Sequence, residues 1–317
     1  MALFVRLPSA RVDKVVTQAS ENLHNSRREQ PQQILAGTAV AVDPSPVLIC
    51  SEDSSERRPV MAELTTARQK AGHFYIWMGG ICAVVAFGGF APTYWLQVPV
   101  GTFVGPTILH VHAALFSAWT LLLVSQTVLA AEGRMNNHRA WGLVGISLAT
   151  AMVCIGLAVA INGLTTSLAA GYGDPARAFF VVPVSGISLF AGFFVAAIVS
   201  VQRSRPQAHK RLMLLATISL LPAPVGRPFF VLAIGGGPGM RPGIGPPLAP
   251  IFGLVPGLVA ELMIVAGIIY DWRTRGRPHP VWLIGAAVMT AVILLRVPLS
   301  GTPAWRAFAD ALAHIGG

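Results

Sequence analysis

Seven runs of about 20 apolar residues, separated by short polar breaks, fill the sequence from Ala71 onward. A run of this length crosses the roughly 30 Å hydrocarbon layer of a bilayer as one α-helix. Because lipid cannot hydrogen-bond to free peptide groups, such a chain folds as a helical bundle within the membrane. We therefore predict an all-α polytopic membrane protein with spans at approximately 71–92, 106–131, 139–163, 179–201, 211–234, 250–270 and 280–299.

The composition excludes the other broad classes of protein. Only 11% of the residues are charged and the mean hydropathy is +0.63, whereas soluble domains contain about 25% charged residues. The formal net charge of +10 does not predict nucleic-acid binding, because the excess basic residues lie in the short breaks between apolar runs. The partner that this pattern predicts is the lipid bilayer.

The basic residues of the short loops predict the orientation, since lysine and arginine are enriched on the cytoplasmic side. If the first span begins inside, eleven basic residues lie on the inner side and three on the outer side. We therefore expect a cytoplasmic N-terminus and a C-terminus outside. The inner set is Arg68, Lys70, Arg134, Arg139, Arg203, Arg205, Lys210, Arg211, Arg273, Arg275 and Arg277, and the outer set is Arg177, Arg241 and Arg306.

The chain divides into three parts by composition. Residues 1–70 are expected to form a flexible cytoplasmic tail, because the first sixty are polar and their seven basic and seven acidic residues balance. An alternative is that translation begins at Met61, which would make the preceding residues a start-site artefact. Residues 71–300 form the predicted membrane domain, and residues 301–317 form a short external C-terminal tail.

Two histidines at the inner ends of different spans could hold a haem. His138 opens the third predicted span and His209 opens the fifth. Axial ligation of a haem iron requires two such side chains from different helices, and the adjacent Arg139, Lys210 and Arg211 could bind the propionates of haem b. Alternatively, these histidines are interfacial residues that contact anionic lipid headgroups.

A second group of polar residues lies in the predicted outer half of the membrane. Arg227, Glu261 and Arg296 fall inside spans, where a charged side chain is costly and often functional. His112 lies at a similar depth, and prolines at 222, 224 and 228 interrupt the span around Arg227. These residues could line a pocket for a small anion. Alternatively, the two arginines extend to the headgroups, and Glu261 pairs with one of them or is protonated.

The second span carries an unusual stripe at helical spacing. His112, Phe116, Trp119, Leu123 and Gln126 share one face, which we expect to face the bundle. His110 and His112 are about 200° apart around a helix and cannot bind one ion together unless the helix unwinds there.

Several of these motifs resemble those of a group of uncharacterised bacterial integral membrane proteins. The motifs are His110 and His112, Gln126, HR-x-x-G at 138–142, HKRLM at 209–213 and GTPAW at 301–305, and the resemblance covers roughly 71–313. The HR and HKRLM motifs are also distantly similar to those of b-type transmembrane cytochromes. The resemblance implies a bacterial inner-membrane location and, more remotely, a haem redox function.

Three functions are compatible with these features. The first is a redox protein with one haem b on His138 and His209. Its electron-transfer partner would be a quinone or another membrane subunit. The second is a transporter or receptor for a small anionic solute at His112, Arg227, Glu261 and Arg296. The third is a non-catalytic subunit of a membrane complex. The sequence contains no zinc-protease, phosphate-loop or dinucleotide motif, and it leaves open whether the protein is an enzyme.

Overall fold

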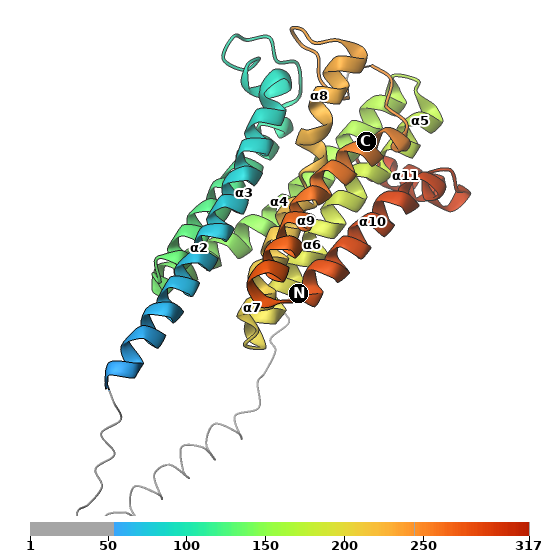
Figure 1. Ribbon diagram of the computed structural model, residues 1–317. Helices are drawn as coiled ribbons and strands as arrows, with labels where there is room; N and C mark the ends of the chain where they lie inside the picture. The colour runs from blue at the N-terminus through green and yellow to red at the C-terminus, as the bar shows by residue number, and fades with distance from the viewer. Residues whose placement is uncertain (1–53, 244, 317) are drawn as a thin grey trace, which may run out of the picture. The chain divides into compact units, whose positions relative to one another are not determined.

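The computed structural model describes residues 54–243 and 245–316, which form helices and no strands (Figure 1). Seven helical stretches among these residues are long and apolar enough to cross a membrane. This confirms the predicted class and number of spans, since each predicted span overlaps one of these stretches. The stretches are Gly72–Trp95, Thr107–Ala131, Met135–Ala169, Gly173–Gln202, Pro206–Ala233, Pro250–Arg275 and Pro280–Ser300.

The first helix, α2 (Ser54–Phe90), begins well before the first apolar run. Residues 54–70, which we expected to belong to a flexible tail, are therefore helical. The reason is that alanine, glutamate, leucine, arginine, glutamine and lysine, which favour helices, are frequent between Met61 and Ala71. The rest of the predicted tail lies outside the described residues. At its far end α2 continues into a π-helical turn, η1 (Ala91–Trp95).

The second and third spans are α3 (Thr107–Ala131) and α4 (Met135–Ala169). They pack together extensively and are joined by a tight turn in which Gly133 has a φ of 74°. Helix α2 approaches α3 closely through glycines. A Cβ atom at Gly72 would lie 2.9 Å from Cβ of Ala131, and one at Gly79 would lie 3.5 Å from Oγ1 of Thr127.

The fourth span combines α5 (Gly173–Phe179) with α6 (Val181–Gln202). The fifth is divided into α7 (Pro206–Ile218) and α8 (Pro222–Ile234), as its prolines predict. Residues 219–221 separate the two halves at the point where Pro222, which has no N–H, begins the new helix. Helix α8 retains Pro228 in its interior.

The sixth and seventh spans are α9 (Leu254–Arg275), preceded by a 3₁₀ turn η2 (Pro250–Gly253), and α10 (Pro280–Ser300). Glycines again permit close packing. A Cβ at Gly267 would lie 2.6 Å from the ring of Trp282, which is completely buried. The main core joins α2, α3, α4, α6, α7, α9 and α10 through buried residues such as Met78, Trp119, Phe190 and Ile264.

Residues 303–316 form a further helix, α11 (Pro303–Gly316), where we expected a short tail. Thr302 accepts a hydrogen bond from the backbone N–H of Trp305 (3.2 Å), and Pro303 follows it at a position that favours helix initiation. Figure 1 shows α11 beside α5. Trp305 and Ala309 bury α11 against α4 and α5, and Arg177 binds Asp310 at 2.7 Å.

Candidate functional site

The structure brings together the two histidines that the sequence paired. His138 lies in the first turn of α4 and His209 in the first turn of α7, and the centres of their imidazole rings are 6.4 Å apart, with the ring planes at 86°. Both side chains are partly buried. Bonds from a histidine nitrogen to a metal ion are about 2 Å long. The two rings are therefore close enough together for one metal ion to be bound by both.

The surroundings of the two rings differ. Nδ1 of His209 lies 3.1 Å from the backbone carbonyl oxygen of Ala197 on α6. If Nδ1 carries the proton and donates to that carbonyl, Nε2 keeps its lone pair for a ligand, which is the usual arrangement of metal-binding histidines. Nδ1 of His138 is buried without a hydrogen-bond partner, and so are both side-chain polar atoms of Gln126.

Gln126 belongs to the same neighbourhood, because its backbone lies beside the ring of His138. It comes from α3, so three helices contribute to this cluster. We call Gln126, His138 and His209 the histidine cluster. A buried polar atom without a partner is costly. A ligand that binds in this cluster would therefore find groups ready to accept or donate hydrogen bonds.

Of the three basic residues predicted to bind propionates, only one has no other described partner. Arg139 is exposed next to His138. Lys210 places its Nζ 4.4 Å from the centre of the Tyr75 ring on α2. Arg211 is held in a buried ion pair with Asp271 on α9, with Nε 2.8 Å from Oδ2 and Nη2 2.5 Å from Oδ1. The geometry therefore favours Arg139 for the predicted role.

The Arg211–Asp271 pair forms part of a larger network at this end of the bundle. The guanidinium of Arg211 also donates to the backbone oxygen (2.7 Å) and side-chain oxygen (3.0 Å) of Gln207. Asp271 accepts the backbone N–H of His279 at 3.1 Å. Asp271 is a charged residue that the sequence reasoning missed. It lies one residue beyond the sixth predicted span, and its only signal in the sequence is an acid among several arginines.

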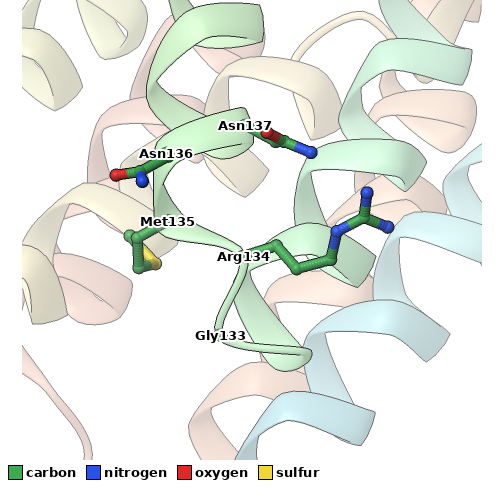
Figure 2. Close-up of a pocket in the computed structure, with 5 residues that line it drawn as sticks. All are labelled: Gly133, Arg134, Met135, Asn136 and Asn137. Atoms are coloured by element: carbon green, nitrogen blue, oxygen red, sulfur yellow. The ribbon is translucent and has the colours of Figure 1, made fainter.

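A shallow hollow of about 300 Å³ lies at the turn between α3 and α4. Figure 2 shows its lining, in which the side chains of Arg134 and Asn137 extend to one side of the turn and those of Met135 and Asn136 to the other. Neither histidine of the cluster lines this hollow. The hollow is open to the surface. It is next to the histidine cluster in the sequence, because Asn137 precedes His138.

The four residues predicted to line an outer pocket do not form one cluster. Nε of Arg296 donates to the hydroxyl of Ser185 on α6 (2.6 Å), and Arg296 is only 3% exposed. Glu261 on α9 accepts a hydrogen bond from Thr290 on α10 (2.7 Å). Within the described residues no ion pair joins Glu261 to either arginine, so of the two alternatives for Glu261 only a protonated carboxyl stays as a prediction. Residues at one depth can lie on different faces of their helices.

His112 and Arg227 remain together at that end of the bundle. The positive charge of Arg227 acts on the imidazole of His112, and its guanidinium stacks over the ring of Phe90 at 4.9 Å. The part of the chain that the structure describes offers Arg227 no hydrogen bond or ion pair. Nδ1 of His112 is also buried without a partner, while its ring stacks on Phe116 with centres 4.0 Å apart.

The stripe on α3 faces the bundle as predicted. Trp119 and Leu123 are buried, and the indole N–H of Trp119 donates to Oγ1 of Thr217 on α7 (3.1 Å). The ring also makes edge contacts with Phe190 and Phe194 on α6. The stripe therefore joins α3 to α6 and α7 between the two polar ends.

Comparisons with known proteins add no assignment. No protein-family model, curated protein or solved structure matches this chain. Among residues 72–316, apart from the few whose side chains are not described, no group of three or more histidine, cysteine or acidic side chains could hold a metal ion. The histidine cluster and the Arg227 region both contain buried polar atoms without a hydrogen-bond partner, and we consider these two regions as candidate ligand sites.

Proposed function

We propose that this protein is a membrane redox protein that holds one haem b through His138 and His209. The observation that carries the proposal is their separation of 6.4 Å between ring centres, from two helices that are distant in sequence. The hydrogen bond of His209 to Ala197 supports it, since that bond would leave Nε2 directed away from the backbone as a ligand.

Each residue near the pair has a definite task in this proposal. His138 and His209 would hold the iron, and Arg139 would neutralise a propionate. Gln126 offers an amide that can hydrogen-bond to His138 or to the edge of the bound group. A haem held by these two histidines would supply one-electron transfer. The predicted orientation places this site near the cytoplasmic face.

The test is an optical spectrum of the protein purified in detergent after expression with added haem. We expect a Soret band and, after dithionite reduction, sharp α and β bands. His138→Ala and His209→Ala should each lose these bands, whereas His73→Ala, at an exposed position on α2, should keep them. A colourless protein from haem-replete cells would overturn the proposal, as would a spectrum unchanged in the His138→Ala/His209→Ala double variant.

Folding must be separated from ligation in this experiment. His→Met substitutions provide that separation, because methionine can replace histidine as an axial ligand and raises the reduction potential. We expect His209→Met to retain haem with a shifted α band and a higher potential. Loss of haem from His138→Ala with an unchanged elution volume in size-exclusion chromatography would then report ligation and not misfolding.

A further inference from the structure

Two irregular helical segments meet at the end of the bundle opposite the histidine cluster. One is the π-helical turn η1, and the other is α8, which contains Pro228; the two are in contact. Gly89 on α2 lies directly against Pro224 of α8, because a Cβ at Gly89 would lie 2.6 Å from the carbonyl carbon of Pro224. Irregular backbone at membrane depth is tolerated where protein or water covers it, and π-helical turns are frequent at functional sites.

Arg227 brings an unneutralised charge to this junction. Its guanidinium contacts the face of Phe90, which is a weak interaction for a cation inside a membrane span. Among the described residues no carboxylate forms an ion pair with Arg227. Glu261 is hydrogen-bonded to Thr290, and Asp174 binds Arg177 and Arg306.

Several hydrogen-bonding groups on the adjoining segments also lack partners. Oγ1 of Thr93 and the indole N–H of Trp95, both in η1, are buried without a hydrogen bond. Thr93 is only 2% exposed. Nδ1 of His112 is also buried without a hydrogen-bond partner. With the guanidinium of Arg227 this set is rich in donors, so the missing partner is an acceptor of hydrogen bonds.

The loops that follow η1 and α8 are hydrogen-bonded to each other and add a second positive charge. The side chain of Gln97 accepts from the N–H of Gly239 (3.1 Å) and donates to the carbonyl of Met240 (3.0 Å). Arg241 donates to the carbonyl oxygen of Val104 at 2.5 Å. Burial lowers the pKa of Arg241, and its charge acts on Arg227. Two cations near one another, without a described acid between them, favour an anionic ligand.

We propose that the junction of η1, α3 and α8 is a binding site for an oxyanion, a carboxylate or phosphate group, held by Arg227 and His112. A planar oxyanion can accept two hydrogen bonds from one guanidinium, and His112 adds a third donor when Nδ1 is protonated. The ring of Phe90 would fix the guanidinium plane. This site omits Arg296 and Glu261, and it is independent of haem at the other end of the bundle.

The oxyanion could belong to a soluble molecule or to a lipid headgroup. We would measure the thermal unfolding of the protein in a maltoside detergent, which contains no phosphate or carboxylate. One arm titrates inorganic phosphate and sodium benzoate at constant ionic strength. The other adds phosphatidylglycerol at a few molecules per protein. Stabilisation in the first arm identifies a soluble anion, and stabilisation only in the second identifies a lipid headgroup.

The variants decide whether the response belongs to this site. We expect Arg227→Gln to weaken the apparent affinity about tenfold or more, because it removes charged hydrogen bonds, and His112→Phe to weaken it less. Arg203→Gln, at an exposed position on the opposite end, should respond as the wild type does. An equal response of wild type and Arg227→Gln would overturn the proposal, and so would the absence of any stabilisation in both arms.

Discussion

Arg211 on α7 and Asp271 on α9 form a two-point ion pair that is sealed from solvent, with side-chain exposures of 1% and 0%. Nε and Nη2 of the arginine bind the two carboxylate oxygens. Breaking a buried pair by removing one partner leaves an uncompensated charge, which costs about 3–5 kcal/mol. The pair therefore fixes α7 to α9 at the end of the bundle where the histidine cluster lies.

We accordingly expect Asp271→Ala to lower the free energy of unfolding in detergent by about 3–5 kcal/mol. The double variant Arg211→Met/Asp271→Leu should recover much of that loss, because it removes both charges and keeps the volume. Arg273→Ala, at an exposed position on the same helix, serves as the control. A single variant as stable as the wild type would show that Arg211 finds water or another partner when Asp271 is gone.

Adjacent glycines on α2 provide a test of the close approach to α8. A Cβ at Gly89 would lie 2.7 Å from Cβ of Pro224, whereas one at Gly88 would have no neighbour within 4 Å. Gly89→Ala should destabilise the protein by about 1–3 kcal/mol through overpacking. Gly88→Ala should stabilise it by up to about 1 kcal/mol, because alanine favours the helix.

The two glycine variants are to be compared by thermal unfolding under the same conditions. The decisive result is a decrease in Tm for Gly89→Ala and an increase for Gly88→Ala, since both changes add one methyl group to the same helix. Effects of the same sign and size would mean that α2 and α8 are not in close contact. If the oxyanion site exists, Gly89→Ala should also reduce its affinity, because it displaces Phe90 from Arg227.

The hydrogen bond between Trp119 and Thr217 gives a third prediction. Thr217→Val preserves the shape of the side chain but leaves the indole N–H buried without a partner, which costs about 1–3 kcal/mol. Thr217→Ser keeps the hydroxyl and should cost less. Thr150→Val, on an exposed face of α4, controls for the loss of a helix-internal threonine bond. Equal Tm values for Thr217→Val and Thr150→Val would show that the interhelical bond contributes nothing.

The sequence predicted the number and class of the spans because a helix that crosses a bilayer needs a long apolar run. Such a run can be recognised in the sequence without knowledge of the fold. It also predicted a shared depth for His138 and His209, and the structure shows that their helices meet. Depth alone failed for Glu261 and Arg296, since it does not specify which face of a helix a residue occupies. That choice depends on long-range packing, as with Arg296 and Ser185 or Arg211 and Asp271.

The missed helices have a different cause. Helix α11 has Trp305, Ala309 and Leu312 at spacings of four and three, which is the pattern of an amphipathic helix. This signal is short, and a length criterion for membrane spans does not detect it. The extension of α2 before Gly72 is polar, so hydropathy does not distinguish it from a tail.

The protonation state of His279 should make the stability of the protein depend on pH. It caps α10, where its Nδ1 accepts the backbone N–H of Val281 at 3.2 Å. Burial lowers the pKa of His279, and the charges of Arg211 and Arg275 lower it further. A proton on Nδ1 would remove the acceptor, so the cap requires the neutral ring. In the unfolded chain the pKa returns to about 6.5.

The sign of the effect follows from these two states. Well above pH 6.5 the ring is neutral in both the folded and the unfolded chain, and His279 adds no pH dependence. As the pH falls below about 6.5, the unfolded chain binds a proton that the folded protein does not, and stability decreases by at most about 1.4 kcal/mol per pH unit. His279→Asn keeps a cap acceptor but does not titrate. We therefore expect the wild type to lose more Tm than His279→Asn between pH 7.5 and 5.0; parallel curves would contradict this role for His279.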